Sequence, residues 1–335
     1  MTTQIVFSRE FSKHNNPSHP ENAARLQVMI EEINKTSFSK DLEFIEPELL
    51  PEKILYDIHS ENMIEQVKEM SSQDGSWIDM DTYVCKSDFK TARLAAGGLV
   101  KLCNAVIKNN ADNGFALIRP PGHHATKTRS MGFCLFNNAA IAANELSKQG
   151  KKTLIFDLDV HHGNGTQDIF YDRSDVFYQS IHLSPHYPGT GDYDEIGEGE
   201  GKGYTINAPL SYGNGNKAVS KLLNQIFLPI AKKFNPDMII ISSGYDSHHM
   251  DPLGGLRFTT DFYGEMTAKL QEIQPKIVGT LEGGYNFQWI GKCLVSQLAR
   301  LTNNDVKFND SAVESESVDD LIKKLKNELK NYWEI

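Results

Sequence analysis

Residues 153–165, TLIFDLDVHHGNG, combine a short apolar run with a polar cluster that follows it directly. The run Thr153–Leu158 is rich in β-branched side chains, which favour β-strands. Its apolar residues are nearly continuous instead of alternating with polar ones. Such a run predicts a strand that is buried on both faces, as the strands of a parallel sheet are.

The same pattern recurs from about residue 115 onward. Short apolar runs occur at Phe115–Ile118, Thr153–Leu158, Val176–Ile181, Tyr204–Ala208, Met238–Ser242 and Ile277–Leu281. Helix-like segments alternate with them at 93–109, 135–148, 217–234, 260–273 and 288–301. This alternation predicts βαβ units. We therefore expect an α/β protein with a mostly parallel central sheet and helices on both of its faces.

We expect residues 1–335 to form one domain, because no flexible linker interrupts this pattern and α/β folds often reach this length. Residues 302–316 are polar and predict a surface loop. Ser317 and Asp320 then have the spacing of a helix capping box. Three leucines follow at helical spacing, namely Leu321, Leu325 and Leu329. Because such stripes usually cover a core, we expect this terminal helix to dock on the domain and not to bind a partner protein.

The composition limits the cellular setting and the partners. The formal net charge is -10, which argues against non-specific binding of nucleic acid and slightly favours cationic substrates. The four cysteines form no C-x-x-C pair, which argues against a disulfide framework and fits a reducing compartment. The sequence has no signal-peptide pattern at its start and no apolar run that could cross a bilayer. We therefore expect a cytoplasmic protein that does not insert in membranes.

Polar clusters follow almost every apolar run. They comprise residues 119–124, 159–165, 182–189, 244–246 and 282–286. In a parallel sheet the carboxyl ends of the strands share one edge, so these clusters should meet there. Asp159 and His161 are two residues apart at a strand end and can point the same way. With Asp246 from another strand they would give a metal ion three ligands and leave one position open, which is typical of a catalytic site.

Two further groups could complete such a site. The pair His123-His124 follows a buried strand inside a Pro-Pro-Gly frame, whereas His248-His249 is expected to be an ordinary loop pair. Tyr285 follows two glycines that permit a tight turn. Its hydroxyl could donate a hydrogen bond to a developing oxyanion. For each residue alone, a surface or buried structural role remains the alternative.

Taken together, these motifs resemble the histone deacetylase superfamily, whose members include acetylpolyamine amidohydrolases and acetoin-utilisation-type proteins. The shared motifs are RPPGHH (119–124), GFCxxNN (132–138), DxDVHHGNGT (157–166), PGTG (188–191), SGYDxxxxDPLGG (243–255) and LEGGYN (281–286). They occur in the family's order between about residues 14 and 300. The DVHHGNGT wording resembles the class II branch. The resemblance implies the three-layer arginase-deacetylase fold.

The resemblance also implies roles for the site residues. Asp159, His161 and Asp246 would hold the catalytic Zn²⁺, and this ligand set would also accept Fe²⁺ or Co²⁺. His124 would be the general base and then the general acid, with His123 as its electrostatic partner and Asp157 orienting His123. Tyr285 would hold the oxyanion. Asn164 stands where class I enzymes have an Asp behind the second histidine, so His124 should be less basic here.

Substrate and ion sites are implied in the same way. Phe133 and Tyr187 would flank the acyl tunnel, and the carbonyl of Gly132 would accept the scissile N–H. Leu253 would lie at the mouth, with Asp81 or the nearby Asp79 as an acidic rim. Two structural K⁺ or Na⁺ sites are also implied. The first would use Asp157, Asp159, His161, Ser180 and Ile181, and the second would use carbonyls near Phe170, Arg173, Val176 and Tyr204.

The function predicted from these residues is the metal-dependent hydrolysis of an acetylated amine, most favourably an N-acetyl-lysine side chain. Acetylpolyamines and small acetylated metabolites remain alternatives, and the oligomeric state stays open. A two-manganese ureohydrolase is disfavoured because Gly163 and His248 stand where its additional acids would be needed. A non-catalytic acyl-lysine binding module is disfavoured because every expected catalytic residue is present.

Overall fold

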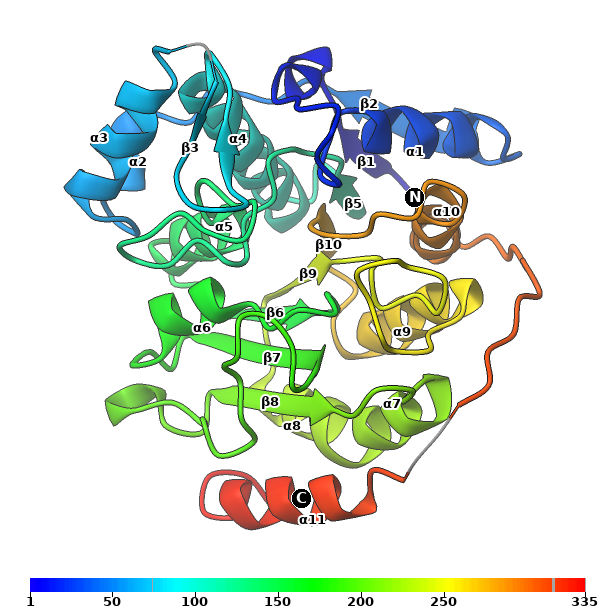
Figure 1. Ribbon diagram of the computed structural model, residues 1–335. Helices are drawn as coiled ribbons and strands as arrows, with labels where there is room; N and C mark the ends of the chain where they lie inside the picture. The colour runs from blue at the N-terminus through cyan, green and yellow to red at the C-terminus, as the bar shows by residue number, and fades with distance from the viewer. Residues whose placement is uncertain (74, 315–316, 335) are drawn as a thin grey trace.

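One eight-stranded parallel sheet forms the centre of the protein in a computed structural model, which describes residues 1–73, 75–314 and 317–334 (Figure 1). The strands are arranged in the order β2-β1-β5-β10-β9-β6-β7-β8. Their bounds are β1 (Thr3–Val6), β2 (Leu42–Ile45), β5 (Asn113–Ala116), β6 (Thr153–Asp157), β7 (Val176–Leu183), β8 (Thr205–Leu210), β9 (Met238–Ser243) and β10 (Ile277–Leu281). The carboxyl ends of all eight strands therefore lie along one edge.

The central strands are buried on both faces, as their nearly continuous apolar sequences predict. Every residue of β5, β6, β7, β9 and β10 is buried. The predicted strand Phe115–Ile118 was placed two residues too late, because β5 begins at Asn113 and ends at Ala116. Leu117 and Ile118 remain buried beyond its end, so apolar character alone could not locate the end of the ladder.

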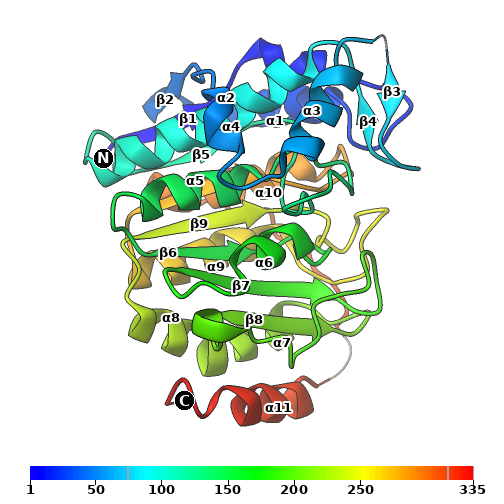
Figure 2. The ribbon, with the colours of Figure 1, turned by 90° about the vertical axis from the view of Figure 1, so that its left-hand side faces the viewer.

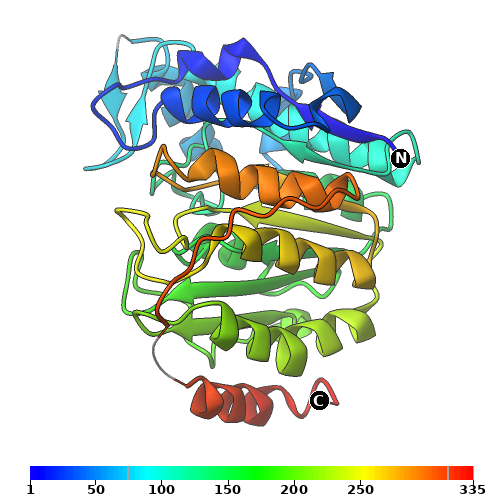
Figure 3. The same cartoon turned by 90° about the vertical axis from the view of Figure 1, so that its right-hand side faces the viewer.

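Helices cover both faces of the sheet. One face carries α4 (Asp88–Ile107), α5 (Asn138–Ser147) and α6 (Asn164–Phe170) (Figure 2). The other carries α1 (Ala24–Asn34), α7 (Asn216–Leu222), α8 (Leu228–Phe234), α9 (Thr260–Ile273) and α10 (Ile290–Leu301), with a π-helical turn at Leu223–Phe227 joining α7 to α8 (Figure 3). This arrangement confirms the predicted α/β architecture. Within the described ranges, no helix is long and apolar enough to cross a membrane.

The first 112 residues contribute elements that the strand–helix alternation did not predict. The short strands β1 and β2 extend the sheet beyond β5, and β2 is its partly exposed edge. Two short helices, α2 (Glu52–Leu55) and α3 (Glu61–Met70), precede a small antiparallel hairpin. That hairpin consists of β3 (Ser76–Trp77) and β4 (Tyr83–Val84). Single 3₁₀ turns occur at Arg9–Lys13, Ser39–Asp41 and Gly199–Gly201.

The C-terminal segment returns along the helical face that carries α9 and α10 (Figure 3). Its last helix, α11 (Asp319–Leu329), packs on the turn between α7 and α8. The buried side chains of this helix are Ile322, Leu325 and Leu329, whereas the predicted Leu321 is only partly buried. The apolar face is thus rotated relative to the one we expected.

The predicted capping box at the start of α11 is wrong. Val318 is the N-cap residue, and it provides no side-chain hydrogen bond. Ser317 lies one residue too early to reach the third amide of the helix, and its hydroxyl instead accepts a hydrogen bond from the Asp319 amide at 3.2 Å. Of the polar loop predicted at 302–316, residues 315 and 316 lie outside the described residues.

Candidate active site

A cavity of about 170 Å³ opens at the carboxyl edge of the sheet, where the structure brings the polar clusters together. It is lined by Asp81, Pro121, His123, His124, Gly132, Phe133, Cys134, His161, Tyr187, Gly283 and Tyr285. These residues come from loops that follow β5, β6, β7 and β10, and from the β3–β4 hairpin. Pro121 and Cys134 were not predicted to line it. They lie in the motifs RPPGHH (119–124) and GFCxxNN (132–138), in which roles were predicted for other residues.

The three predicted metal ligands lie together beside this cavity. Asp159, His161 and Asp246 each offer one ligand atom, and these atoms lie within 4.8 Å of one another. Nδ1 of His161 is 2.9 Å from Oδ1 of Asp159 and 3.3 Å from Oδ2 of Asp246. Asp159 follows β6 and Asp246 follows β9, and these two strands are neighbours in the sheet.

The hydrogen bonds around these carboxylates leave room for a cation. Oδ2 of Asp159 accepts the Gly283 amide at 2.9 Å, and Oδ1 of Asp246 accepts the Val160 amide at 2.9 Å. Oδ2 of Asp246 is fully buried and accepts no hydrogen bond from any described residue. A Cβ atom at Gly283 would lie 2.1 Å from this same oxygen, so only glycine fits there.

The charges of the three residues also fit a divalent metal. Burial opposes a charge on His161, but the carboxylates of Asp159 and Asp246 outweigh it and raise the pKa of His161 to about 10. Burial and the charge of Asp159 raise the pKa of Asp246. The pair of acids thus attracts positive charge strongly. Two carboxylates and one imidazole are a ligand set that zinc accepts, with a coordination position left open.

The adjacent histidines have opposite electrostatic surroundings. Nδ1 of His123 lies 3.1 Å from Oδ2 of Asp157. Although burial disfavours the charged ring, Asp159 and Asp157 raise the pKa of His123 to about 10. Nδ1 of His124 lies 2.8 Å from the amide oxygen of Asn164. Burial, followed by the charges of His123 and His161, lowers the pKa of His124 well below its usual value.

Glu282 fixes the backbone of the histidine pair, a role that the sequence did not reveal. It is fully buried, and its Oε2 accepts the amides of Gly122 at 2.7 Å and of His123 at 3.2 Å. Burial raises the pKa of Glu282 to about 7. The signal available in the sequence was its place directly after β10, next to the Gly-Gly-Tyr turn.

Aromatic side chains surround the entry to the histidines. The rings of Phe133 and Tyr285 meet edge to face with centroids 5.9 Å apart, and Tyr187 meets His124 in the same way at 5.1 Å. Phe133 has φ +69°, and Gly132 before it has φ +56°. A Cβ atom at Gly132 would lie 2.5 Å from the His124 ring. The peptide at this turn therefore packs directly on the proposed base.

Of the residues predicted at the rim of the cavity, some line it and others do not. Asp81 lines the cavity, whereas Oδ1 of Asp79 accepts the amides of Asp81 and Thr82 at 3.1 and 2.7 Å and shapes the hairpin turn. Leu253 is partly buried and is not on the cavity wall. Its carbonyl accepts a hydrogen bond from His186, whose ring stacks on His161 with centroids 4.8 Å apart. His186 was not predicted.

The residues of the two implied monovalent-cation sites lie on or next to β6, α6, β7 and β8. Asp157 is the register partner of Ser180, and its Oδ1 accepts the Asp159 amide at 3.1 Å. At the second position, the Phe170 carbonyl accepts the Arg173 amide at 3.0 Å, and the Tyr204 carbonyl accepts the Tyr178 amide at 3.0 Å. Cation binding at either position stays a prediction.

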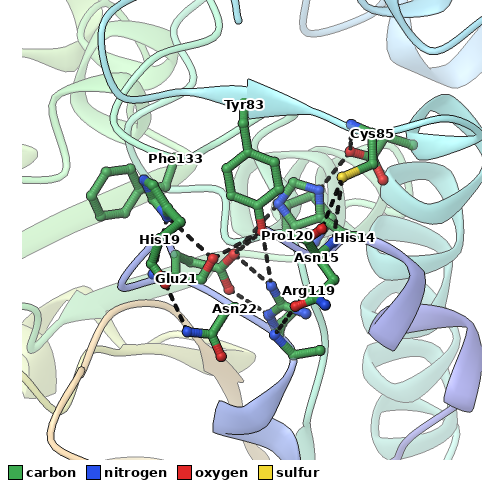
Figure 4. Close-up of polar contacts among 12 residues, drawn as sticks. His14, Asn15, His19, Glu21, Asn22, Tyr83, Cys85, Arg119, Pro120 and Phe133 are labelled. Carbon is green, nitrogen blue, oxygen red and sulfur yellow. Dashed lines mark hydrogen bonds and ion pairs between the residues drawn. The ribbon is translucent and has the colours of Figure 1, made fainter. Parts of the chain in front are cut away.

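A buried charged network lies behind Phe133 (Figure 4). At its centre, Glu21 binds both Nε and Nη2 of Arg119, the latter at 2.6 Å, and Nη1 of Arg25 at 3.0 Å. The hydroxyl of Tyr83 donates to the same carboxylate at 3.1 Å. At its edge, His19 packs edge to face on Phe133 with centroids 4.5 Å apart. The network thus supports one wall of the cavity.

Two other groups among the described residues have the composition of a metal site. They are His14-Cys85-Asp88 and His248-His249-Asp310. In the first, Nδ1 of His14 lies 2.6 Å from Asp88. In the second, His248 accepts the Met250 amide at Nδ1, so its Nε2 carries the proton and donates toward Asp310 at 3.1 Å. Hydrogen bonds account for the second group, whereas Nε2 of His14 and Oδ1 of Asp88 in the first are buried without a hydrogen bond from the described residues.

Comparisons with known proteins identify the family. Residues 19–301 match the histone deacetylase domain. A probable deacetylase of Archaeoglobus fulgidus is 39% identical over 297 residues, which cover 86% of this chain and 82% of the relative. The chloroplastic histone deacetylase 10 of Oryza sativa is 36% identical, with 82% of this chain and 68% of the relative covered.

A solved structure agrees with this assignment. The HDA15 HD domain superposes with a TM-score of 0.93 at 34% identity and covers 99% of this chain and 97% of its own. The sheet and its flanking helices are therefore those of the α/β arginase-deacetylase fold. The chain belongs to the histone deacetylase family.

Proposed function

We propose that this member of the deacetylase family is a zinc-dependent enzyme that hydrolyses the amide of an N-acetyl-lysine side chain to free lysine and acetate. One observation carries the proposal. A single cavity is lined by His123, His124 and Tyr285, and the trio Asp159, His161 and Asp246 meets at its wall. These are the chemical groups that metal-assisted amide hydrolysis needs.

The metal would be held by Asp159, His161 and Asp246. Zinc is the ion we propose, and Fe²⁺ or Co²⁺ would suit the same ligands. When bound, it would act as a Lewis acid on the acetyl carbonyl and on the attacking water. The buried Oδ2 of Asp246 supports this assignment, because it accepts no hydrogen bond from the described residues and lies 3.3 Å from Nδ1 of His161.

His124 is suited to move the protons. Its Nδ1–H donates to Asn164, so Nε2 keeps its lone pair. His124 takes a proton from water as the water oxygen bonds to the acetyl carbon. It then delivers that proton to the amide nitrogen as the C–N bond breaks, which releases acetate and the amine. His123, whose pKa is raised to about 10, would supply a positive charge beside Asp157.

Tyr285 would stabilise the oxyanion that forms during attack. Burial raises the pKa of Tyr285 well above its ordinary value, so the phenol keeps the proton that it must donate. Phe133 and Tyr187 would hold the methylenes of the substrate, and the Gly132 carbonyl would accept its N–H. Asp81 at the rim would bind the backbone of a peptide substrate.

The test is acetate release by the purified, metal-loaded protein. An acetyl-lysine peptide, an acetylspermidine-type amine and a longer acyl-lysine peptide are compared by kcat/KM, with and without a chelator. We expect the acetyl-lysine peptide to be preferred, activity to disappear with chelator, and Zn²⁺ to restore it. Preference for the acetylated polyamine would contradict the substrate. Absence of turnover at full metal loading would favour a non-catalytic acyl-lysine binding module.

A further inference from the structure

The carboxylate of Asp251 joins the loop after β9 to the loop after β10. Its Oδ2 accepts the backbone amides of Tyr285 at 2.7 Å and of Asn286 at 3.1 Å. Its Oδ1 accepts the Leu253 amide at 3.0 Å. Hydrogen bonds to a carboxylate are roughly twice as strong as those between neutral groups. Asp251 therefore fixes the two peptide units on either side of Tyr285, from which the phenol side chain extends.

The backbone at Tyr285 needs such an anchor. Two glycines precede the tyrosine, and Gly284 has φ +107°, a conformation that only glycine adopts readily. Arg25 holds the near side of this turn by donating to the Gly284 carbonyl at 2.8 Å and to the Glu282 carbonyl at 2.6 Å. Asp251 holds the far side. Without it, the amides of Tyr285 and Asn286 would lose their partner.

A purely local role for Asp251 explains only part of these contacts. Its bond to the Leu253 amide, two residues ahead, is an ordinary Asx turn. That turn uses Oδ1 alone. Both bonds of Oδ2 reach a different loop, 34 and 35 residues away. The second oxygen is thus committed to the tyrosine loop.

We propose that Asp251 is a positioning residue, which sets the Tyr285 phenol in the cavity without lining the cavity itself. The inference rests on the proposed function, because it assigns a purpose to the phenol. Asp251 lies five residues after the metal ligand Asp246. One short loop would therefore fix both the metal and the oxyanion donor relative to each other.

The principal test is Asp251→Asn. An amide has the same size but only one acceptor oxygen. If that oxygen keeps the Asx turn, the NH₂ group faces two N–H donors and displaces the tyrosine loop. We expect kcat for the acetyl-lysine peptide to fall by about 10- to 100-fold, less than the loss on removing an oxyanion donor altogether. KM and zinc content should change less than about twofold, because the tunnel and metal ligands remain.

Coupling to Tyr285 distinguishes positioning from general damage. Residues that act through one group have non-additive effects. We therefore expect Asp251→Asn to lower kcat less than about threefold when Tyr285→Phe is already present. Asp251→Glu keeps both oxygens and the charge, and should show the same coupling with a smaller loss. It also serves as the second variant if Asp251→Asn binds zinc poorly.

Asp310→Asn is the matched control. Asp310 contacts the loop that carries Asp251, because its Oδ2 lies 3.1 Å from His248 Nε2 and 3.2 Å from His249 Nε2. It makes no contact with Tyr285 that the described structure shows. Its effect on kcat should be the same with and without the phenol. The inference is overturned if Asp251→Asn leaves kcat unchanged, or lowers it equally in both backgrounds. Absence of wild-type turnover would instead contradict the proposed function.

Discussion

Two buried acidic sites lie close to the cavity: one is the carboxylate of Glu21, and the other is the pair Asp159 and Asp246. The two sites differ in the cationic side chains that face them. Glu21 is bound by the guanidinium group of Arg119 (Figure 4) and by that of Arg25. Among the described residues, the ion pairs of Asp159 and Asp246 are with imidazoles, namely His161 and, for Asp159, also His123. A guanidinium is always charged in a protein, whereas an imidazole can release its proton. The counter-charges of Glu21 are therefore permanent, whereas those of Asp159 and Asp246 can be lost when an imidazole releases its proton.

The pKa of Asp246 follows this difference, whereas that of Asp159 does not. Burial opposes ionisation of Glu21, but Arg119 and the nearby His14 hold its pKa well below the ordinary value. Burial and Asp159 instead raise the pKa of Asp246. Burial also opposes ionisation of Asp159, but His123 and His161 hold its pKa low, so only Asp246 shifts in the opposite direction to Glu21. A site with permanent counter-charges is complete as it stands, and a site with titratable ones can exchange a proton for a metal ion.

The largest effect is expected from Asp246→Asn. The variant should lose bound zinc, and turnover should fall by more than about 10³-fold because metal-assisted chemistry ends. Stability of the metal-free protein should be unchanged or higher, since one of two adjacent buried acids is removed. Zinc content by elemental analysis, acetate release and urea unfolding of the chelated protein measure these outcomes. A variant with full zinc content would contradict the ligand assignment.

Glu21→Gln should have the opposite profile. Removing one partner of a buried ion pair leaves uncompensated charges and costs roughly 3–5 kcal/mol. Here the guanidinium groups of Arg119 and Arg25 would both lose their carboxylate. Urea unfolding should show this loss, while the folded fraction should still bind one zinc ion. If the variant lost zinc and kept its stability, the contrast between the two groups would be wrong.

Tyr285→Phe tests the chemistry next to the metal without changing either group of charges. We expect kcat to fall by about 10²- to 10³-fold, the usual loss for one oxyanion donor. Zinc content and stability should stay near wild type. The ring keeps its edge contact with Phe133 and its place under Arg25, whose guanidinium lies 5.1 Å from the ring centroid. Near-normal kcat would remove Tyr285 from the mechanism.

The strands of the sheet also differ in how well the sequence predicts them. β6, β9 and β10 coincide with largely apolar runs that alternate with helical segments, so their burial and their parallel orientation could be predicted from the sequence pattern. The strands β1 and β2 have four residues each, including Gln4 and Glu43, and carry too little pattern. They could be found only through their pairing with β5 and with each other.

Within the site, residues at strand ends were predictable and their supports were not. Asp159, His161 and Asp246 follow apolar runs directly, and parallel strands must bring such residues to one edge. Glu282, Asp251 and His186 act through backbone amides, carbonyls or ring stacking. These contacts depend on how separate loops fold against each other.

The smallest expected effect concerns His14, a titratable side chain that forms an ion pair with Glu21. Nδ1 of His14 lies 2.6 Å from Asp88, and Nε2 lies 3.4 Å from Glu21. Burial opposes the charged ring, but Asp88 and Glu21 together raise the pKa of His14 above its ordinary 6.5. The folded protein therefore holds this proton to higher pH than the unfolded chain does. Its stabilising effect is complete below pH 6.5 and is lost as the pH rises through the folded pKa.

His14→Gln isolates this contribution, because glutamine can donate a hydrogen bond to Asp88 but has no titratable charge. The free energy of unfolding, measured by urea between pH 6 and 9 on the chelated protein, should fall more with pH in wild type than in the variant. The gap should stay below the cost of Glu21→Gln, since the two guanidinium groups remain charged throughout. Parallel curves would mean that His14 is neutral in the folded protein. Arginine alone would then neutralise Glu21, and the distinction between permanent and titratable counter-charges would become sharper still.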